Sequence, residues 1–86
     1  MYKIEFKKSA KKEFEKLPAN IQERVLEALR FLSQNPYSEV LQVKKLRGAD
    51  SLYRIRLGDY RILYTIENAK LVIIVIKIGH RSDVYR

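Results

Sequence analysis

The stretch LYRIRLGDYRILYTI, from Leu52 to Ile66, decides the fold of this chain. Two runs of alternating side chains flank Gly58-Asp59, and a two-residue connection that begins with glycine is typical of a β-hairpin closed by a type II′ turn. Such a turn fixes which residues of the two strands stand opposite each other. The predicted pairs are Leu57 with Tyr60, Arg56 with Arg61, Ile55 with Ile62, Arg54 with Leu63 and Tyr53 with Tyr64.

The two faces of this hairpin differ in chemistry, because successive side chains of a strand point to opposite faces. One face is apolar and aromatic and is expected to meet the helices: Tyr53, Ile55, Leu57, Tyr60, Ile62 and Tyr64. The other face gathers Arg54, Arg56 and Arg61. Like charges directly opposed on a sheet lower its stability, so we interpret this cluster as a binding site for an anion. The structural alternative is a solvated face on which nearby acidic residues pair with the arginines: Asp50, Asp59, Glu67 or Asp83.

The residues before the hairpin predict one strand and two helices. Tyr2 to Lys7 alternates as a short strand, and Ser9 is expected to cap a first helix that Pro18 ends. The sequence NIQE, with Asn20 in the cap position, has capping-box spacing for a second helix that Asn35-Pro36 ends. Each helix has one apolar stripe to bury in the core. The stripes are Ala10, Phe14 and Leu17 in the first helix, and Ile21, Val25, Ala28, Leu29 and Leu32 in the second.

After the hairpin, LVIIVIKIG from Leu71 to Gly79 is continuously apolar, which is typical of a central strand covered on both faces. An antiparallel return through a turn near Asn68-Ala69 would bring Arg61 beside Ile76. Three further candidates then emerge at the arginine end of the sheet: His80, Arg81 and Tyr85. The structural alternative to a functional site is a frayed C-terminal tail whose apolar residues only pack on the sheet. The predicted fold is a single α+β domain over residues 1–86, with strand, helix, helix and a three-stranded antiparallel meander, and with both helices on one sheet face.

Composition narrows the possible functions. Eighteen Lys and Arg against ten Asp and Glu give a net charge of +8, and residues 44–86 hold ten basic and four acidic side chains. The electrostatic field of this positive charge attracts a polyanion such as nucleic acid. The alternative is a cationic surface that only keeps the protein soluble. The chain has no cysteine and one histidine, so we expect no metal and no cofactor. No apolar run suits a membrane span or a secretory signal, so we expect a cytoplasmic protein and no membrane partner.

Several stretches occur in an order and spacing that resemble the RelE/ParE superfamily of type II toxin–antitoxin toxins, over essentially the whole chain. They are the opening strand with KKSAKKEFEKLP, KKLRG from Lys44 to Gly48, the YRIRLGDYRILYTI hairpin, the apolar strand, and GHRSDVY from Gly79 to Tyr85. The resemblance implies a RelE-like fold. RelE-like members are ribosome-dependent ribonucleases that cut messenger RNA in the decoding site, whereas ParE-like members act on DNA gyrase. Fold alone does not choose between these activities.

The resemblance also implies roles for single residues. Arg61 matches the arginine that binds the transition-state phosphate, Arg81 a general acid or phosphate ligand, and Tyr85 the aromatic residue that stacks on the nucleotide. Their joint presence favours the RelE branch. The expected substrate-binding residues are Arg54 and Arg56 on the hairpin and Lys44, Lys45 and Arg47 in the KKLRG segment.

The expected reaction is attack of an RNA 2′-OH on the adjacent phosphorus, which needs no metal if cations stabilise the developing charge. Some RelE toxins carry lysines where this chain has Arg54 and Arg56, and arginine effectively cannot lose a proton. The general base therefore stays open between His80, Tyr85 and a mechanism of positioning and electrostatics without a dedicated base.

The partners that the resemblance implies are a cognate antitoxin, the ribosome with messenger RNA, and operator DNA through the antitoxin complex only. Two alternatives from other classes stay open. One is a ParE-like gyrase inhibitor that acts by binding, and the other is a non-catalytic basic module that binds nucleic acid.

Overall fold

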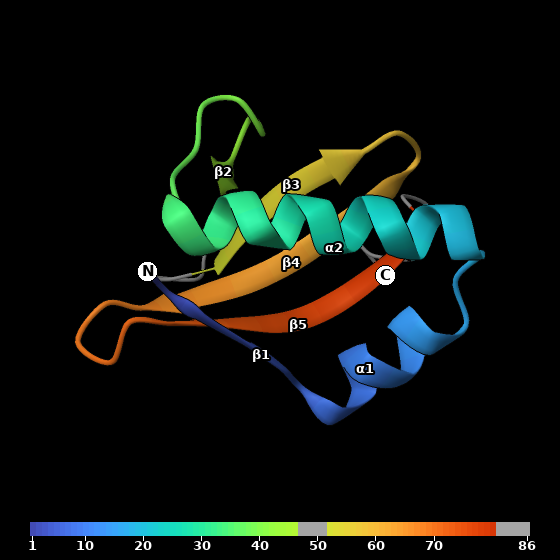
Figure 1. Cartoon of the computed structure of the whole chain (residues 1–86), viewed down its shortest axis with the longest axis horizontal. Helices are drawn as coiled ribbons and strands as arrows, with labels where there is room; N and C mark the ends of the chain where they lie inside the picture. The colour runs from blue at the N-terminus through green and yellow to red at the C-terminus, as the bar shows by residue number, and fades with distance from the viewer. Residues whose placement is uncertain (47–51, 81–86) are drawn as a thin grey trace.

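The computed structural model describes residues 1–46 and 52–80. Its elements are β1 (Lys3–Phe6), α1 (Lys8–Glu15), α2 (Ala19–Gln34), β2 (Lys44–Lys45), β3 (Leu52–Leu57), β4 (Tyr60–Glu67) and β5 (Val72–His80) (Figure 1). The strands form one sheet in the order β1-β5-β4-β3-β2. The predicted meander β3-β4-β5 is its antiparallel centre, with β1 added in parallel to β5 and the short β2 added in antiparallel orientation to β3.

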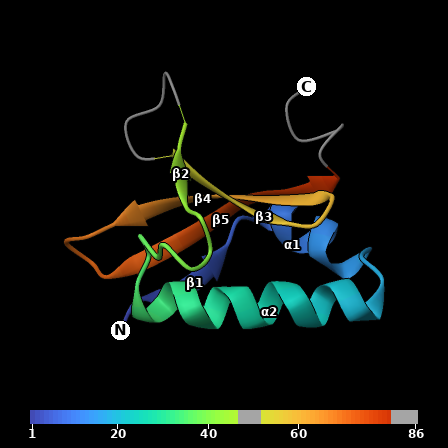
Figure 2. The same ribbon diagram turned by 90° about the horizontal axis from the view of Figure 1, so that it is seen from above.

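Both helices lie on the same side of the sheet, which confirms the predicted α+β architecture (Figure 2). α2 runs across that side, and α1 lies at its edge, in contact with β5. The predicted stripe of α2 is buried at Val25, Ala28, Leu29 and Leu32, and Ala10 of α1 is fully buried. No helix within the described residues is long and apolar enough to cross a membrane.

The register of the β3–β4 hairpin is the predicted one, including Arg56 opposite Arg61. Gly58 has a φ of 61°, and Asp59 is not among the residues with positive φ. Positive φ at the first turn residue alone distinguishes a type II′ turn from a type I′ turn. Ile55, Ile62 and Tyr64 are completely buried on the helix side, so the predicted apolar face is confirmed there.

The register between β4 and β5 differs from the expectation: Arg61 stands opposite Gly79, not beside Ile76. Two local features cause the shift. The strands are joined by a longer turn, Asn68–Leu71, in which Leu71 takes a φ of 54°. A register irregularity between Leu63 and Tyr64 then inserts one further residue of β5. Both features move Arg61 toward the C-terminal end of β5.

The predicted cap of the first helix is wrong. α1 begins at Lys8 with Lys7 at its N-cap, so Ser9 lies inside the helix. The reason is that β1 still pairs with β5 at this point: the amide of Lys7 donates to the carbonyl oxygen of Val75 at 2.9 Å. The chain passes directly from this last sheet hydrogen bond into the helix.

The predicted capping box of the second helix is also wrong, because α2 begins at Ala19 with Pro18 at the N-cap and no side-chain cap. Proline suits a helix start, since its fixed φ is already helical. Asn20 therefore lies within the first turn. Gln22, the third residue of the NIQE motif, instead donates its side-chain amide to the carbonyl oxygen of Phe14 at 3.0 Å and satisfies the end of α1.

The buried Tyr64 connects the core to the segment after α2 through a hydrogen bond. Its hydroxyl donates to the carbonyl oxygen of Pro36 at 3.0 Å, and its ring stacks on Tyr53 with centroids 5.9 Å apart. Burial, with smaller contributions from Tyr53 and Tyr37, raises the pKa of the Tyr64 hydroxyl. The hydroxyl therefore stays protonated and acts as a donor throughout the neutral range.

Candidate active site

The sheet face that points away from the helices gathers basic side chains from four strands, and we call it the arginine face. Two rows cross it. The first row runs through Lys44, Arg54, Leu63 and Lys77, which pair in succession from β2 to β5. The second row runs through Arg56, Arg61 and Gly79. Sequence reasoning placed the three arginines and Lys44 but missed Lys77, because the register of β5 was not predictable.

Arg61 is the most unusual residue of this face, because a charged side chain is rarely buried. Only 4% of it is exposed. Its Nη1 donates to the carbonyl oxygens of Gly58 at 3.3 Å and Tyr60 at 3.2 Å, both at the hairpin turn. Its Nε is buried and has no hydrogen-bond partner among the described residues. The turn thus holds the guanidinium in place while leaving part of its hydrogen-bonding capacity unused.

Arg56 and Arg61 have no carboxylate partner among the described residues. Across residues 1–46 and 52–80, the ion pair recorded is between Lys77 and Glu13, so neither Asp59 nor Glu67 pairs with an arginine there. Asp50 and Asp83 lie outside the described residues. An arginine without a carboxylate partner, buried opposite a second arginine, has the chemistry of an anion site.

The flanking basic residues are more accessible than Arg61. Arg54 is half-buried, and Arg56 is exposed directly opposite Arg61. Lys44 pairs with Arg54 and shares its face, whereas Lys45 pairs with Tyr53 and starts from the opposite face; both are exposed on β2, at the edge of the sheet. A phosphate held at Arg61 in β4 would therefore have the cations of β3 and β2 on one side. An RNA strand could extend from Arg61 along these cations.

His80 does not share the arginine face. It pairs with Tyr60, and their rings meet edge to face with centroids 5.8 Å apart. Because side chains alternate along β5, His80 starts from the opposite side of the sheet to Gly79, which neighbours Arg61. His80 thus lies at the same end of the sheet as Arg61, as predicted, but starts from the opposite face. The remaining predicted site residues lie outside the described residues: Arg81, Tyr85 and Arg47. Within the described residues, no group of side chains suited to a metal ion occurs.

Comparison with known proteins assigns the family. The model of the family described as ParE toxin of type II toxin-antitoxin system, parDE, matches residues 4–85. The chain belongs to this toxin family. Its relatives place it among the RelE-like members: it is 30% identical over 86 residues to putative toxin RelE1 of Methanocaldococcus jannaschii, covering 99% of this chain and 96% of that protein. It is 33% identical over 88 residues to mRNA interferase toxin RelE of Escherichia coli K12, covering 98% and 90% of the two chains.

Solved structures of RelE toxins share the fold. The isolated E. coli RelE toxin matches with a TM-score of 0.83 and 34% identity, covering 99% of this chain and 92% of that one. RelE in the RelE–RelB complex of Pyrococcus horikoshii matches with a TM-score of 0.82 and 34% identity, covering 96% and 98%. The predicted RelE-like fold is confirmed.

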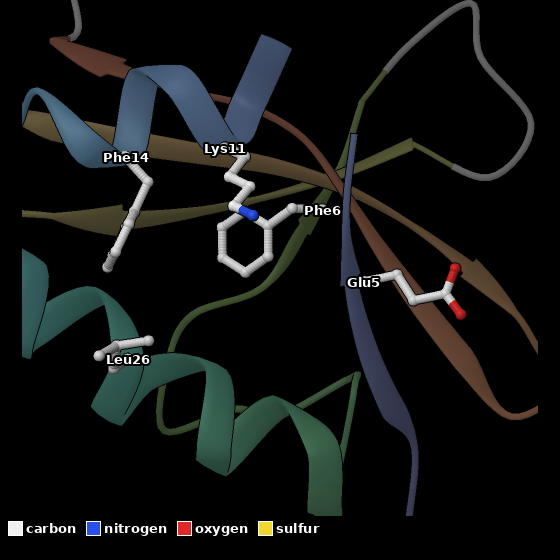
Figure 3. A pocket seen from close by; sticks show the side chains of 5 residues that line it. All are labelled: Glu5, Phe6, Lys11, Phe14 and Leu26. Carbon is white, nitrogen blue, oxygen red and sulfur yellow. The ribbon is translucent and has the colours of Figure 1, made fainter. Parts of the chain in front are cut away.

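This RelE-like toxin also has an apolar groove on its helix side, between β1, α1 and α2 (Figure 3). A cavity of about 500 Å³ is lined by Phe6, Phe14, Leu26 and Lys11, with Glu5 at its border. A second cavity, of about 280 Å³, shares Phe6 and Leu26 with it. The groove lies across the sheet from the arginine face, and its lining is mainly apolar apart from Glu5, Lys11 and, in the second cavity, Arg30 and Ser33.

Proposed function

We propose that this RelE-like toxin is the toxin of a type II toxin–antitoxin pair and an endoribonuclease that cleaves messenger RNA on the ribosome, in the cytoplasm. One observation carries the proposal: Arg61 is buried, lacks a carboxylate partner in the described part of the chain, and stands directly opposite Arg56. A phosphate that becomes more negative during reaction is the ligand such a site favours. The names of the relatives, among them mRNA interferase toxin RelE, point to the same activity.

The reaction is an internal transfer on RNA. The 2′-oxygen forms a bond to the adjacent phosphorus as the bond from phosphorus to the 5′-oxygen breaks, which gives a 2′,3′-cyclic phosphate and a 5′-hydroxyl. The proton leaves the attacking hydroxyl, and another is supplied to the departing 5′-oxygen. Negative charge rises on the phosphoryl oxygens during this step, and the fixed guanidinium of Arg61 stabilises it.

The other predicted site residues take supporting roles in this proposal. Arg54, Arg56, Lys44 and Lys45 bind phosphates on one side of the reacting bond, together with Arg47 of the KKLRG segment. Cations at successive phosphates fix the register of a strand without reading its sequence.

Two residues after β5 complete the proposed active site. Arg81 serves as general acid or as a second phosphate ligand, and Tyr85 stacks on a base. These two roles rest on the family resemblance, since neither residue lies in the described part of the chain.

The proposed mechanism depends mainly on positioning and electrostatics. Neither Arg54 nor Arg56 can act as general base, because arginine stays protonated. His80 stays a predicted base, and its ring would have to pass round the end of β5 to reach a 2′-hydroxyl beside Arg61. Catalysis by orientation alone predicts slow chemistry in free solution, with the ribosome bending the RNA into the reactive geometry.

The proposed regulator is a cognate antitoxin. Crystal structures show the relatives from E. coli and P. horikoshii in the RelBE toxin–antitoxin complex and in the RelE–RelB complex. The net charge of +8 favours an acidic partner segment, which would compete with RNA for the arginine face. Binding of operator DNA is proposed for the antitoxin complex only.

The decisive experiment adds purified toxin to ribosomes that hold a defined messenger RNA, and maps the cleavage ends. Naked RNA and the Arg81→Ala variant serve as controls. Cuts inside the decoding-site codon that require both the ribosome and Arg81 are the expected result. Since the matching family model bears the ParE name, gyrase inhibition is the second candidate. Absence of ribosomal cleavage, together with inhibited supercoiling by gyrase, would replace the proposed function with that one.

A further inference from the structure

Among the described residues, no strand covers one side of the C-terminal half of β5. β1 pairs with β5 only as far as Phe6 opposite Val75, whereas β5 continues to His80 (Figure 1). Beyond Val75, α1 lies where β1 would have continued. A main-chain amide that points to this side needs an acceptor from α1 or from water.

Glu13 of α1 supplies that acceptor. Its Oε1 accepts a hydrogen bond from the main-chain amide of Ile78 at 3.1 Å, and its Oε2 accepts one from the Nζ of Lys77 at 3.0 Å. The carboxylate thus replaces the missing strand at one residue of β5. Ile78 is only 1% exposed, so water has poor access to its amide if the carboxylate is removed.

The position of Glu13 is fixed by the packing of its own helix. Ala10, one turn before it, is fully buried, and Phe14, next to it, meets Phe6 edge to face with ring centroids 5.7 Å apart. Through these contacts α1 packs against β1 and β5. Because the backbone of α1 is held in this position, the Glu13 side chain stays close to the edge of β5. Forming the hydrogen bond to Ile78 therefore costs little conformational entropy.

The residue held by Glu13 directly precedes the arginine site. Ile78 is followed by Gly79, which stands opposite Arg61, and by His80, where β5 ends. In the sequence, the proposed catalytic residue Arg81 comes next. The Glu13 carboxylate therefore fixes the backbone of β5 two residues before its end at His80.

From this geometry we infer that Glu13 is a positioning residue of the toxin: by accepting from the amide of Ile78, it holds the end of β5 in the place that the reaction requires. The inference rests on the proposed function. It assigns the effect to the backbone hydrogen bond and not to the ion pair with Lys77. Both partners of that ion pair are about a third exposed, at 37% and 32% of their side chains, and water screens pairs of this kind.

Four variants separate the hydrogen bond from the charge and from the helix. Glu13→Ala removes both contacts, whereas Glu13→Gln keeps an acceptor for Ile78 and loses the charge. The double variant Glu13→Lys with Lys77→Glu restores opposite charges but puts a donor where the acceptor was. Glu15→Ala, at an exposed position of the same helix, is the matched control.

The first readout is the single-turnover rate of cleavage on ribosomes at saturating toxin, with the toxin–ribosome dissociation constant measured separately. Glu13→Ala and the charge-swapped double variant are expected to cleave about tenfold to a hundredfold more slowly, because small displacements of catalytic groups have effects of this size. Glu13→Gln and Glu15→Ala should stay within about threefold of the original rate, and binding to ribosomes should change little in the three single variants.

The second readout is amide hydrogen exchange at Ile78 and Gly79, which reports on the end of β5 whether or not RNA is cleaved. Faster exchange is expected there in Glu13→Ala and in the double variant only. Unchanged exchange and unchanged rates in these two variants would overturn the inference, as would a rate in Glu13→Gln as low as in Glu13→Ala. Should the unmodified toxin fail to cleave on ribosomes, the proposed function would fall, and the exchange data would still decide whether Glu13 holds the strand end.

Discussion

Replacing Arg61 with methionine separates the stabilising role of this residue from its proposed role in catalysis. Methionine has a similar length and adapts to irregular spaces, so it can occupy the volume of the buried stem without its charge. The site suits this test because Arg61 is 4% exposed and its recorded hydrogen bonds go to the carbonyl oxygens of Gly58 and Tyr60.

The effect on stability follows from opposing contributions of similar size. The two contacts, at 3.3 and 3.2 Å, share the single donor atom Nη1, so their loss costs about 1–2 kcal/mol. Against this, Arg56 stands directly opposite, and the substitution relieves the repulsion between the two charges, since opposed like charges destabilise a sheet. Removing a buried charge also removes its desolvation penalty. We expect the unfolding free energy to change by less than about 1 kcal/mol, which keeps the midpoint within about 8 °C in a domain of this size.

The effect on activity should be far larger, since removing one fixed donor to a developing oxyanion typically slows a reaction about 10²- to 10³-fold. The assay combines thermal unfolding with single-turnover cleavage on ribosomes, and Arg30→Met, at an exposed arginine of α2, is the matched control. A midpoint more than about 10 °C lower would mean that Arg61 is structural. Cleavage at the original rate by folded Arg61→Met protein would refute its role at the transition state.

Three further variants test the fold and the arginine face. Tyr64→Phe removes a buried hydroxyl that bonds a main-chain carbonyl, so denaturant unfolding should show a loss of about 1–3 kcal/mol, against less than about 0.5 kcal/mol for Tyr37→Phe at an exposed position. Because the folded state raises the pKa of Tyr64, the protein should lose stability as pH rises above about 10, where the unfolded chain ionises first, and Tyr64→Phe should reduce that loss. Gly58→Ala should cost about 1–2 kcal/mol in thermal unfolding, since φ is 61° there; an unchanged midpoint would contradict the strained turn. Replacing Lys44 and Lys45 with alanine should reduce the salt dependence of binding to single-stranded RNA by about 1.4 in the log–log slope, whereas removing two exposed lysines from α1 should leave it unchanged.

The hairpin was predictable from the sequence because its information is local. Gly58-Asp59 fixes the turn, the turn fixes which residues are opposed, and alternation then sorts aromatic and arginine side chains to different faces. The same reasoning placed the inward stripe of α2, because helical periodicity repeats over four turns. Each of these predictions depends on residues a few positions apart.

The features that were not predictable depend on contacts between distant segments. The caps at Lys7 and Pro18 depend on where β1 leaves β5 and on how α1 meets α2, not on which residue is the better cap. The pairing of Lys77 with Glu13 joins residues that are far apart in the sequence. The burial of Arg61 was equally hidden, since an arginine in an alternating strand ordinarily indicates an exposed face.

The shift of the β4–β5 register has a direct consequence for the site. In the regular register Arg61 would neighbour Ile76, whose branched side chain would stand beside the guanidinium and compete with a ligand for space. The turn through Leu71 and the irregularity at Leu63 and Tyr64 instead bring Gly79 opposite Arg61. A glycine inside a strand often marks a place where another molecule approaches the backbone closely. The same shift brings Arg61 opposite Gly79, which directly follows Ile78, the residue whose amide donates to Glu13. The register of β4 and β5 therefore places the anion site next to the end of β5 that Glu13 fixes.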